Sequence, residues 1–452
     1  MNWQKVKLKE VLKQYRVQHI VQDTNEYKQV SILNDGSVVL RGSKIGKEIG
    51  RKRQFIIDLK TYPETLIFTR QLLLQGSIGI ASEDVNNCIV TENMPMFSIQ
   101  TSKIDKDFLI LFLKSEVFKS RIRKIELSGS AQKSIHERTF LDLEFFIPKI
   151  EEQKEIVGEL LKLKSHSNSI SIEITHQLDL IKQLRQAFLR EAMQGKLLAP
   201  SLLERAGGEA KTGQQLLIKI KAEKAQFIAD KKLKKEKELP PITEDEIPFE
   251  IPEHWAWCRL GEVAYDLSYG TSQKADDSSE IPVLRMGNIT TDGRILYSNL
   301  KFVSPNIKDL PKLYLKDNDL VFNRTNSYEL VGKCGVFKNE APYTLASYLI
   351  RVRLFEKINS NFISNYINSS FCRQTQIEPQ IIQQNGQANF NGTKLSSIII
   401  PLPPLHEQEQ IVVKLEELMT FCDGLEQSIK ESQGYNEKLL QQVLREALQG
   451  NQ

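Results

Sequence analysis

The sequence predicts a mixed α/β (α+β) protein that is built twice, each time as a globular domain followed by a long helix. The stretch from Glu152 to Gly195 recurs from Glu407 to Gly450 at a constant offset of 255 residues, and fifteen of the 44 aligned positions are identical. Each copy follows a region of short β-branched runs separated by turn residues. A chain whose halves repeat in the same order tends to acquire a pseudo-two-fold axis, which would set the two helices antiparallel.

Both helical copies predict a coiled-coil seam, because their apolar residues recur with a period of 3.5. The predicted seam consists of Ile156, Leu160, Leu163, Ile170, Ile174, Ile181 and Leu184 in the first copy and Ile411, Leu415, Leu418, Leu425, Ile429, Leu439 and Val443 in the second. Polar residues at Ser167, Gln177, Ser432 and Asn436 interrupt the seam and would fix its register. The alternative is two independent amphipathic helices, but their shared length and phase favour pairing with each other.

The expected organisation follows from these repeats and from changes in composition. It comprises a first domain over 1–150, a long helix over 151–195, a basic helix and linker over 196–250, a second domain over 251–400 and a second long helix over 401–452. The stretch from Lys211 to Glu238 carries nine lysines against four acidic residues. It is either a solvated helix that leads into a linker or a helix that lies along a phosphate backbone or an acidic partner.

Composition excludes several classes of protein. A chain of 452 residues with 40% hydrophobic and 26% charged residues is ordinary globular protein of several domains, and a net charge of +4 does not by itself establish a nucleic-acid partner. The five cysteines lie far apart without a C-x-x-C pair, which argues against a zinc site and a disulfide framework. We expect a cytoplasmic protein without a signal peptide or a membrane segment.

The repeat extends faintly into the globular domains. Trp3, Leu8, Glu10 and Val11 match Trp255, Leu260, Glu262 and Val263 at an offset of 252 residues. The run from Leu66 to Arg70 likewise resembles the run from Leu320 to Arg324, whereas most other positions differ. Two domains that share a frame, differ elsewhere and are joined by rigid helices would suit duplex DNA, whose half-sites one turn apart are ~34 Å from centre to centre.

Side chains suited to DNA are Arg for guanine, Asn or Gln for adenine, and Lys, Ser, Thr or backbone N–H for phosphate. In the second domain the candidates are Tyr269, Gly270, Thr271, Ser272, Lys274, Arg285, Asn288, Arg324, Asn326, Gln387 and Asn389. In the first domain they are Arg41, Lys44, Lys47, Arg51, Arg53, Arg70, Gln71, Gln132 and Lys133. For any one of these residues an ordinary surface role is the alternative.

The whole chain resembles the specificity subunits of type I restriction-modification systems. The resemblance is carried by the run Ile400-Pro401-Leu402-Pro403-Pro404-Leu405-His406-Glu407-Gln408, by its weaker twin Ile147-Pro148-Lys149-Ile150-Glu151-Glu152-Gln153, and by the Leu-Arg-Glu-Ala helix endings. The proline-rich stretch from Leu239 to Trp255 and the loop from Tyr269 to Ala275 also match the family. The first domain departs from the pattern, since it lacks both of these features.

The resemblance implies that two target-recognition domains each read one half of a bipartite double-stranded DNA sequence, and that the two helices set the unread spacer. It implies two methyltransferase subunits that use S-adenosylmethionine, and restriction subunits that use ATP and magnesium. The chain itself would hold no metal or cofactor and would carry out no catalysis.

Two rival functions stay open at the level of sequence. The first is a nuclease in its own right, since Asp142 with Glu152 and Lys154 mimics a carboxylate-lysine set; its twin, however, has Glu409 in place of the lysine. The second is a coiled-coil scaffold with two protein-binding domains. An adenine methyltransferase is disfavoured, because the chain lacks an N/D-P-P-Y/F loop.

Overall fold

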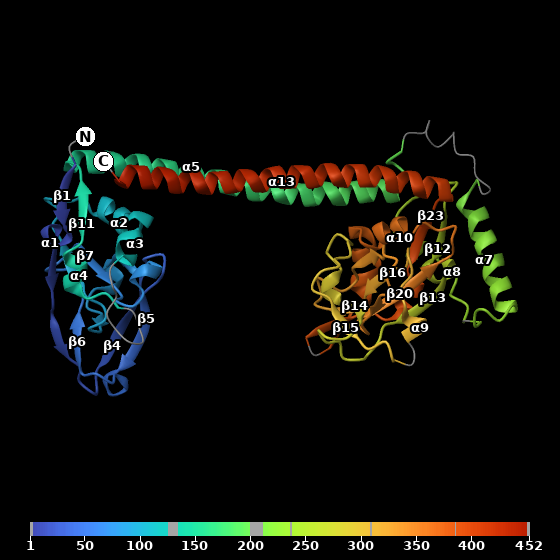
Figure 1. Ribbon diagram of the computed structural model, residues 1–452, viewed down its shortest axis with the longest axis horizontal. Coiled ribbons are helices and arrows are strands. Elements are labelled where there is room, and N and C mark those ends of the chain that lie inside the picture. Colours follow the sequence, from blue (N-terminus) through green and yellow to red (C-terminus); the bar gives the residue numbers. More distant parts are fainter. Residues whose placement is uncertain are drawn as a thin grey trace. The chain divides into compact units, whose positions relative to one another are not determined.

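The computed structural model describes residues 3–124, 134–198, 211–235, 237–307, 310–384 and 386–449. The chain divides into two compact units, Met1–His176 with Ile429–Gln452 and Gln177–Ser428. Each unit contains one globular domain together with parts of both long helices, α5 (Ile150–Met193) and α13 (Leu405–Gln449) (Figure 1).

The first unit is built on a four-stranded antiparallel sheet of order β2-β10-β7-β8. Its strands are Leu12–Tyr15, Met96–Ile99, Thr65–Phe68 and Ile78–Ile80. A second sheet pairs β1 (Gln4–Lys7) with β11 (Glu144–Ile147). A third has the order β3-β6-β9-β4-β5, with bounds Gln18–Ile20, Arg53–Ile56, Ile89–Val90, Glu26–Ile32 and Val38–Ile45. The domain helices are α1 (Leu8–Val11), α2 (Lys106–Lys114), α3 (Glu116–Arg123) and α4 (Glu137–Leu141).

The second unit repeats this frame and adds different sheets. Its central sheet has the order β13-β20-β16-β18, with bounds Ala264–Tyr269, Leu349–Leu354, Leu320–Asn323 and Cys334–Val336, and β12 (Ala256–Arg259) pairs with β23 (Ile399–Leu402). The added sheets are β15-β14-β19 (Lys301–Val303, Ile281–Leu284, Thr344–Leu345) and β17-β22-β21 (Thr325–Asn326, Gln387–Asn389, Ile382–Gln384). The helices are α7 (Gly213–Ala229), α8 (Leu260–Val263), α9 (Leu310–Leu313), α10 (Ser360–Ile367), α11 (Ser370–Cys372) and α12 (Gly392–Ser397).

The internal repeat is visible in individual hydrogen bonds. The Glu10 carboxylate accepts a bond from the Lys7 backbone N–H at 2.7 Å, and the Glu262 carboxylate accepts one from the Arg259 N–H at the same distance. These bonds cap the equivalent short helices α1 and α8. Strand β7 is buried at every position, and so is its counterpart β16. Each of them is an inner strand of its central sheet, with a neighbouring strand on either side. The predicted mixed fold of two domains with long helices is confirmed.

A buried glutamine joins each domain to the first turn of its long helix. In the first unit Gln153 donates to the Pro148 carbonyl at 2.9 Å and accepts from the Asp105 N–H at 2.7 Å. In the second unit Gln408 donates to the Pro403 carbonyl at 2.9 Å and accepts from the Asn359 N–H at 2.9 Å. Both glutamines are 0% exposed, and their partners Asp105 and Asn359 cap the equivalent helices α2 and α10. The proline-to-glutamine motifs are therefore architectural.

The long helices pack antiparallel within each unit. In the first unit Val157 shares a core with Leu448, and the Asn436 amide donates to the Ser167 carbonyl at 3.1 Å. In the second unit Leu189 packs in the same core as Ile411, while Arg185 reaches Met419, Asp423 and Glu426 further along α13. Within each unit, residues later in α5 thus contact residues earlier in α13, so the two helices run in opposite directions. The predicted polar register contact exists between Asn436 and Ser167.

The predicted seam is wrong at three positions. Ile170, Leu425 and Leu439 are 48%, 37% and 56% exposed. The seam passes instead through Ser167, which is 8% exposed, and through Cys422, which is fully buried. Seven-residue steps from the buried Leu160 lead to Ser167, Ile174 and Ile181, so Ile170 falls at the margin. The other predicted seam residues are buried or half-buried.

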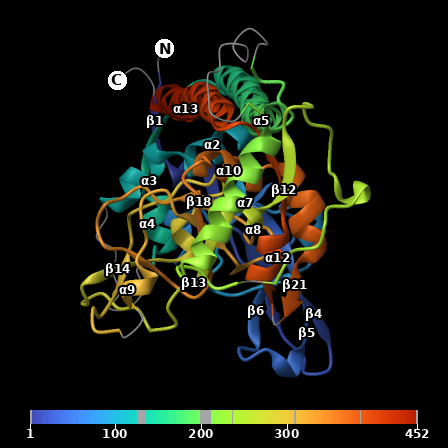
Figure 2. The ribbon, with the colours of Figure 1, turned by 90° about the vertical axis from the view of Figure 1, so that its right-hand side faces the viewer.

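The basic helix α7 is docked on the second domain and does not stand free. Leu216, Leu217 and Ile220 are buried in the core of that domain, and α7 lies against α8, β12 and β23 (Figure 2). The Lys224 ammonium donates to the carbonyls of Gly261 and Ala264 at 2.7 and 2.9 Å. The thin apolar stripe of this helix is thus its contact face; Lys221 is exposed on the helix, and further exposed lysines follow the helix from Lys231 onward.

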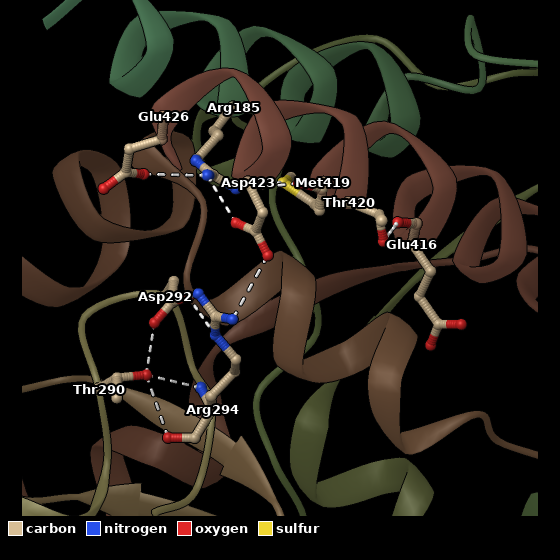
Figure 3. Close-up of polar contacts among 9 residues, drawn as sticks. All are labelled: Arg185, Thr290, Asp292, Arg294, Glu416, Met419, Thr420, Asp423 and Glu426. Atoms are coloured by element: carbon tan, nitrogen blue, oxygen red, sulfur yellow. Dashed lines mark hydrogen bonds and ion pairs between the residues drawn. The ribbon is translucent and has the colours of Figure 1, made fainter. Parts of the chain in front are cut away.

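A polar network joins one loop of the second domain to the helices in the same unit (Figure 3). The Arg185 guanidinium contacts Asp423 and Glu426 at 2.7 and 3.1 Å, and Arg294 reaches Asp423 at 3.4 Å. Arg294 also pairs with Asp292 at 2.6 Å. Burial raises the pKa of Asp292, but bonds from the Thr290 hydroxyl and from Arg294 outweigh it and hold that pKa below its ordinary value. The Asp292 carboxylate therefore stays charged at neutral pH.

Candidate nucleic-acid interface

Several candidates of the second domain meet at one end of its central sheet. Tyr269 is the last residue of β13 and is 45% exposed; its hydroxyl accepts a bond from the Gly392 N–H at 2.9 Å. A Cβ at Gly270 would lie 2.2 Å from the Leu345 carbonyl oxygen, so only glycine permits this approach. Thr271 is buried and forms a bridge with Ala346, while Ser272 and Lys274 are exposed. The loop thus presents Tyr269, Ser272 and Lys274 to solvent.

Arg324 follows β16 directly and lies over this loop. Its guanidinium carbon is 4.9 Å from the centre of the Tyr269 ring, and Nη1 donates to the Ser347 carbonyl at 3.3 Å. The next residues form the small sheet β17-β22-β21, in which Thr325 pairs with Asn389. Asn326 and Asn389 are half-buried, and Gln387 is exposed. The structure therefore brings Tyr269, Arg324, Asn326, Gln387 and Asn389 into one region.

Two candidates of the second domain have other partners. Asn288 is 4% exposed, and its amide donates to the carbonyls of Leu296 and Ser298 at 3.0 Å each while its oxygen accepts from the Arg285 N–H. Asn288 is therefore a structural residue, and its nomination as a DNA contact is corrected. Arg285 is half-buried and donates to the Asn299 carbonyl at 2.7 Å.

In the first domain the basic candidates lie on and after strand β5. This strand is exposed at every position from Val39 to Ile45, so both of its faces meet solvent. Arg41, Lys44 and Lys47 are exposed. Arg51 lies 3.8 Å from Glu92, and Arg53 is exposed on β6. The paired strands β4 and β5 form a ribbon of the kind that fits the major groove of B-DNA.

Arg70 does not present a free guanidinium. It is 15% exposed and pairs with the Glu137 carboxylate, which also accepts bonds from Arg16 at 3.2 Å and Gln14 at 3.4 Å. Burial raises the pKa of Glu137, but the bond from Arg70, a backbone bond and the charges of Arg70 and Arg16 together outweigh it and hold that pKa below its ordinary value. Gln71 is exposed, and Gln132 and Lys133 lie outside the described residues.

The structure adds two exposed side chains that sequence reasoning missed. Tyr348 is 44% exposed, and its carbonyl accepts the Arg324 N–H. Tyr328 is 38% exposed, and its carbonyl accepts a bond from Arg373. Tyr348 is brought beside Arg324 by the pairing of β16 with β20, whereas Tyr328 lies two residues after Asn326 in the sequence.

The long helices also carry exposed apolar residues. In the first unit these are Leu161, Ile170, Ile172, Tyr435 and Leu439, and in the second unit Leu180, Val413, Phe421 and Leu425. Exposed apolar residues mark a surface that another chain covers where they form a contiguous patch, whereas single ones are ordinary.

Within the described ranges there is no group of three or more His, Cys, Asp or Glu side chains that could hold a metal ion. All five cysteines are free and buried. Among the described helices, none combines the length and the apolar character that crossing a membrane requires.

The repeated frame, with different sheets added to each copy, defines a protein of two related modules joined by long helices. A known protein family matches this chain over both modules. The family model described as the type I restriction modification DNA specificity domain matches residues 1–180 and 252–432, and the chain belongs to this family.

Individual relatives agree with this assignment. The specificity subunit of the type I restriction enzyme EcoAI from Escherichia coli is 30% identical over 55% of this chain and 42% of its own length. The EcoEI specificity subunit from Escherichia coli is 23% identical over 80% of this chain and 66% of its own length. The matched region is thus less than two thirds of either relative. A chain from a solved type I restriction-modification system has the same fold, with a TM-score of 0.64 at 16% identity over 100% of this chain and 98% of that one.

Proposed function

We propose that this chain is the DNA-reading specificity subunit of a type I restriction-modification complex and performs no catalysis itself. Each globular domain would read one half of a bipartite duplex, and the helices α5 and α13 would set the unread gap. The observation that carries the proposal is the repeated sheet order, β2-β10-β7-β8 in one domain and β13-β20-β16-β18 in the other, surrounded by sheets that differ. A shared frame with different surfaces suits two different half-sites on one duplex.

The two domains would contact DNA through different elements. The second would use the region around Tyr269, Arg324, Gln387 and Asn389, where planar and amide groups suited to base edges lie together. The first would use the ribbon of β4 and β5, with Arg41, Lys44 and Lys47 near phosphates. Exposed lysines after α7, from Lys231 to Lys237, would add contacts that do not depend on sequence.

Partner subunits would supply the chemistry. We propose that two methyltransferase subunits, with S-adenosylmethionine, cover the exposed apolar residues of α5 and α13, among them Ile172, Phe421 and Tyr435, which are 72%, 59% and 68% exposed. Restriction subunits with ATP and magnesium would join this complex in the cytoplasm. Five unpaired cysteines accord with a reducing compartment.

Methylation mapping tests the proposal. Genomic DNA from cells that express the chain with its methyltransferase partner should carry methylated adenines in one asymmetric, bipartite sequence, which disappears when the chain is deleted. A binding assay on random duplexes and a metal-dependent cleavage assay of the chain alone complete the test. Cleavage by the lone chain would favour a nuclease, and absence of both DNA binding and methylation would favour a protein scaffold.

A further inference from the structure

The arginine that follows the central strand differs in its surroundings between the two domains. Arg70 follows β7 and Arg324 follows β16, at equivalent places in the repeat: the N–H of Thr69 bonds to Ser77, and that of Asn323 bonds to Lys333, in the next strand hairpin. We infer that Arg324 reads a guanine in the half-site of the second domain, whereas Arg70 stabilises the first domain. The inference rests on the proposed DNA-reading function and names the base and the residue.

The backbone of Arg324 is fixed on both sides. Its N–H donates to the Tyr348 carbonyl at 3.0 Å, and its carbonyl accepts from the Phe390 N–H at 2.8 Å. The side chain is also oriented, since the guanidinium lies over the Tyr269 ring, whose hydroxyl is held by the Gly392 N–H at 2.9 Å. A guanidinium held against an aromatic face loses little further freedom on binding, so it is prepared for a planar ligand.

The hydrogen-bonding capacity of Arg324 is largely unused. Nε is buried without a protein partner among the described residues, and the bond from Nη1 to Ser347 is long at 3.3 Å. Nε of Arg70 and of Arg285 is buried without a partner in the same way, so what separates Arg324 from Arg70 is that no carboxylate among the described residues engages its guanidinium.

Except for Arg285, whose Nε also lacks a partner, the other part-buried arginines considered in the same unit are engaged by carboxylates. Arg259 donates to Glu246 and to three backbone carbonyls. Arg351 pairs with Asp266 at 2.6 Å, Arg353 with Asp319 at 2.9 Å and Arg373 with Glu378 at 2.8 Å. Arg324 has no such acid among the described residues. It therefore differs from the arginines that hold the domain together.

Arg70 differs from Arg324 in having a carboxylate partner, although its Nε likewise lacks a partner among the described residues. Its Nη2 donates to Glu137, a carboxylate that is 12% exposed and also pairs with Arg16. Reading a base with Arg70 would break this buried pair and leave Glu137 charged without its main partner, which is strongly unfavourable. The first domain must therefore read its half-site with other side chains.

Guanine is the base that the exposed edge of Arg324 fits. The guanidinium fork donates two parallel bonds to O6 and N7 of guanine in the major groove, and this is the commonest specific arginine contact. The amides nearby complement it: Thr325 donates to the Asn389 oxygen at 2.8 Å, which orients this amide beside the arginine strand. A phosphate could also accept two bonds from this fork, so the effect of Arg324→Lys on base preference, as against affinity, separates the two contacts.

Selection from a random-sequence duplex library by the purified full-length chain tests the inference. The wild type should enrich one bipartite motif. Arg324→Lys keeps the charge but loses the fork, so preference for guanine at one position of one half should fall about ten- to a hundred-fold. Arg324→Gln should move the preference at that position toward adenine, because glutamine pairs with adenine. The control Arg70→Lys should leave the motif unchanged, and thermal melting verifies that every variant is folded.

The outcomes separate the inference from the function on which it rests. A weakened preference for guanine at one position, confined to one half of the motif, supports the inference. Uniform weakening at an unchanged motif would make Arg324 a phosphate contact, and an unchanged motif and affinity would exclude any role in reading; either result overturns the inference but leaves the proposed function standing. A wild-type chain that enriches no sequence overturns both.

Discussion

The two domains share one arrangement of strands, but the corresponding face is covered by a helix in the second domain and exposed to solvent in the first. In the second domain α7 covers this face: Gly261, the counterpart of Lys9, is buried, and its carbonyl accepts a bond from Lys224 of α7. In the first domain the equivalent strands and helix carry the ion pairs Lys5–Glu144 at 2.6 Å and Lys9–Asp142 at 2.9 Å, with side chains about half exposed. No helix is needed there, because polar side chains already meet solvent. The central sheet is therefore the constant part of the two domains, whereas the element that covers it depends on the surface beneath.

The linker shows the same asymmetry. Arg259, at the end of β12, is 3% exposed and binds the carbonyls of Pro240 and Pro241, so the linker is held against the second domain. Its counterpart in the first domain is Lys7, at the end of β1, which is half-buried. The proline-rich motif of the second half thus has its physical basis in one arginine that the first half lacks.

The largest effect on stability is expected at the buried glutamine that occurs in both domains. Gln408→Leu and Gln153→Leu should each destabilise their own domain by about 2–5 kcal/mol, because a buried carbonyl and a buried N–H lose their partners. Hydrogen exchange measured by mass spectrometry should show faster exchange in the second domain for the first variant and in the first domain for the second. Gln441→Leu, at an exposed position of α13, is the control. Equal exchange rates in all three variants would contradict the role of the buried glutamines in joining each domain to its long helix.

A smaller and one-sided effect is expected at the linker. Arg259→Leu should destabilise the second domain by about 2–4 kcal/mol, because three carbonyls and Glu246 lose a buried partner. The matched change Lys7→Leu should alter stability by less than about 0.5 kcal/mol. Proteolysis between residues 237 and 250 should accelerate only in the first variant. Equal sensitivity of both variants would remove the distinction between the domains.

The pH dependence of the first domain should depend on Glu137. Its folded pKa lies below the ordinary value of 4.5, so the charged group stabilises the fold above that value and this contribution is lost as pH falls through the folded pKa. Glu137→Gln should therefore cost about 1–2 kcal/mol at pH 7 and close to nothing near pH 2. Urea denaturation at both pH values measures this; a cost that persists at pH 2 would show that geometry and not charge matters.

The smallest change is expected from lengthening the helices. Four residues inserted after Lys164 advance the helix by about 1.1 turns and add roughly 6 Å. Since DNA rises ~3.4 Å per base pair, the gap between half-sites should grow by about one or two base pairs while the bases read stay the same. Methylation sequencing of cells that carry the insertion provides the measurement. An active complex with an unchanged gap would refute the role of the helices as a spacer.

The sequence predicted the repeat and the long helices because periodicity survives without knowledge of tertiary contacts. It did not predict the seam at single-residue precision. Leu439 and Leu440 are adjacent, and only the packed phase makes Leu440 half-buried and Leu439 exposed. Gln153 and Gln408 were visible as identical positions, but their role required the distant N–H groups of Asp105 and Asn359.

The candidate site was predictable only in part. The loop after β13 and the residues around Arg324 were nominated one by one from glycine, hydroxyl and amide content, and only the structure shows that several of them lie together. Asn288 carries the same amide group as the other candidates, yet this amide already donates to the carbonyls of Leu296 and Ser298. Arg70 likewise could not be distinguished from Arg324, because Glu137 lies 67 residues further along the chain. Whether a polar side chain is free or engaged depends on long-range packing.

The most direct test of the central claim is an exchange of the second domain. Because α7 packs on that domain, residues 211–404 should be replaced together by the matching part of a relative with a different target. We predict that the methylated sequence changes in one half only, with the other half and the gap preserved. A change in both halves, in a complex that still methylates, would contradict independent reading by two modules.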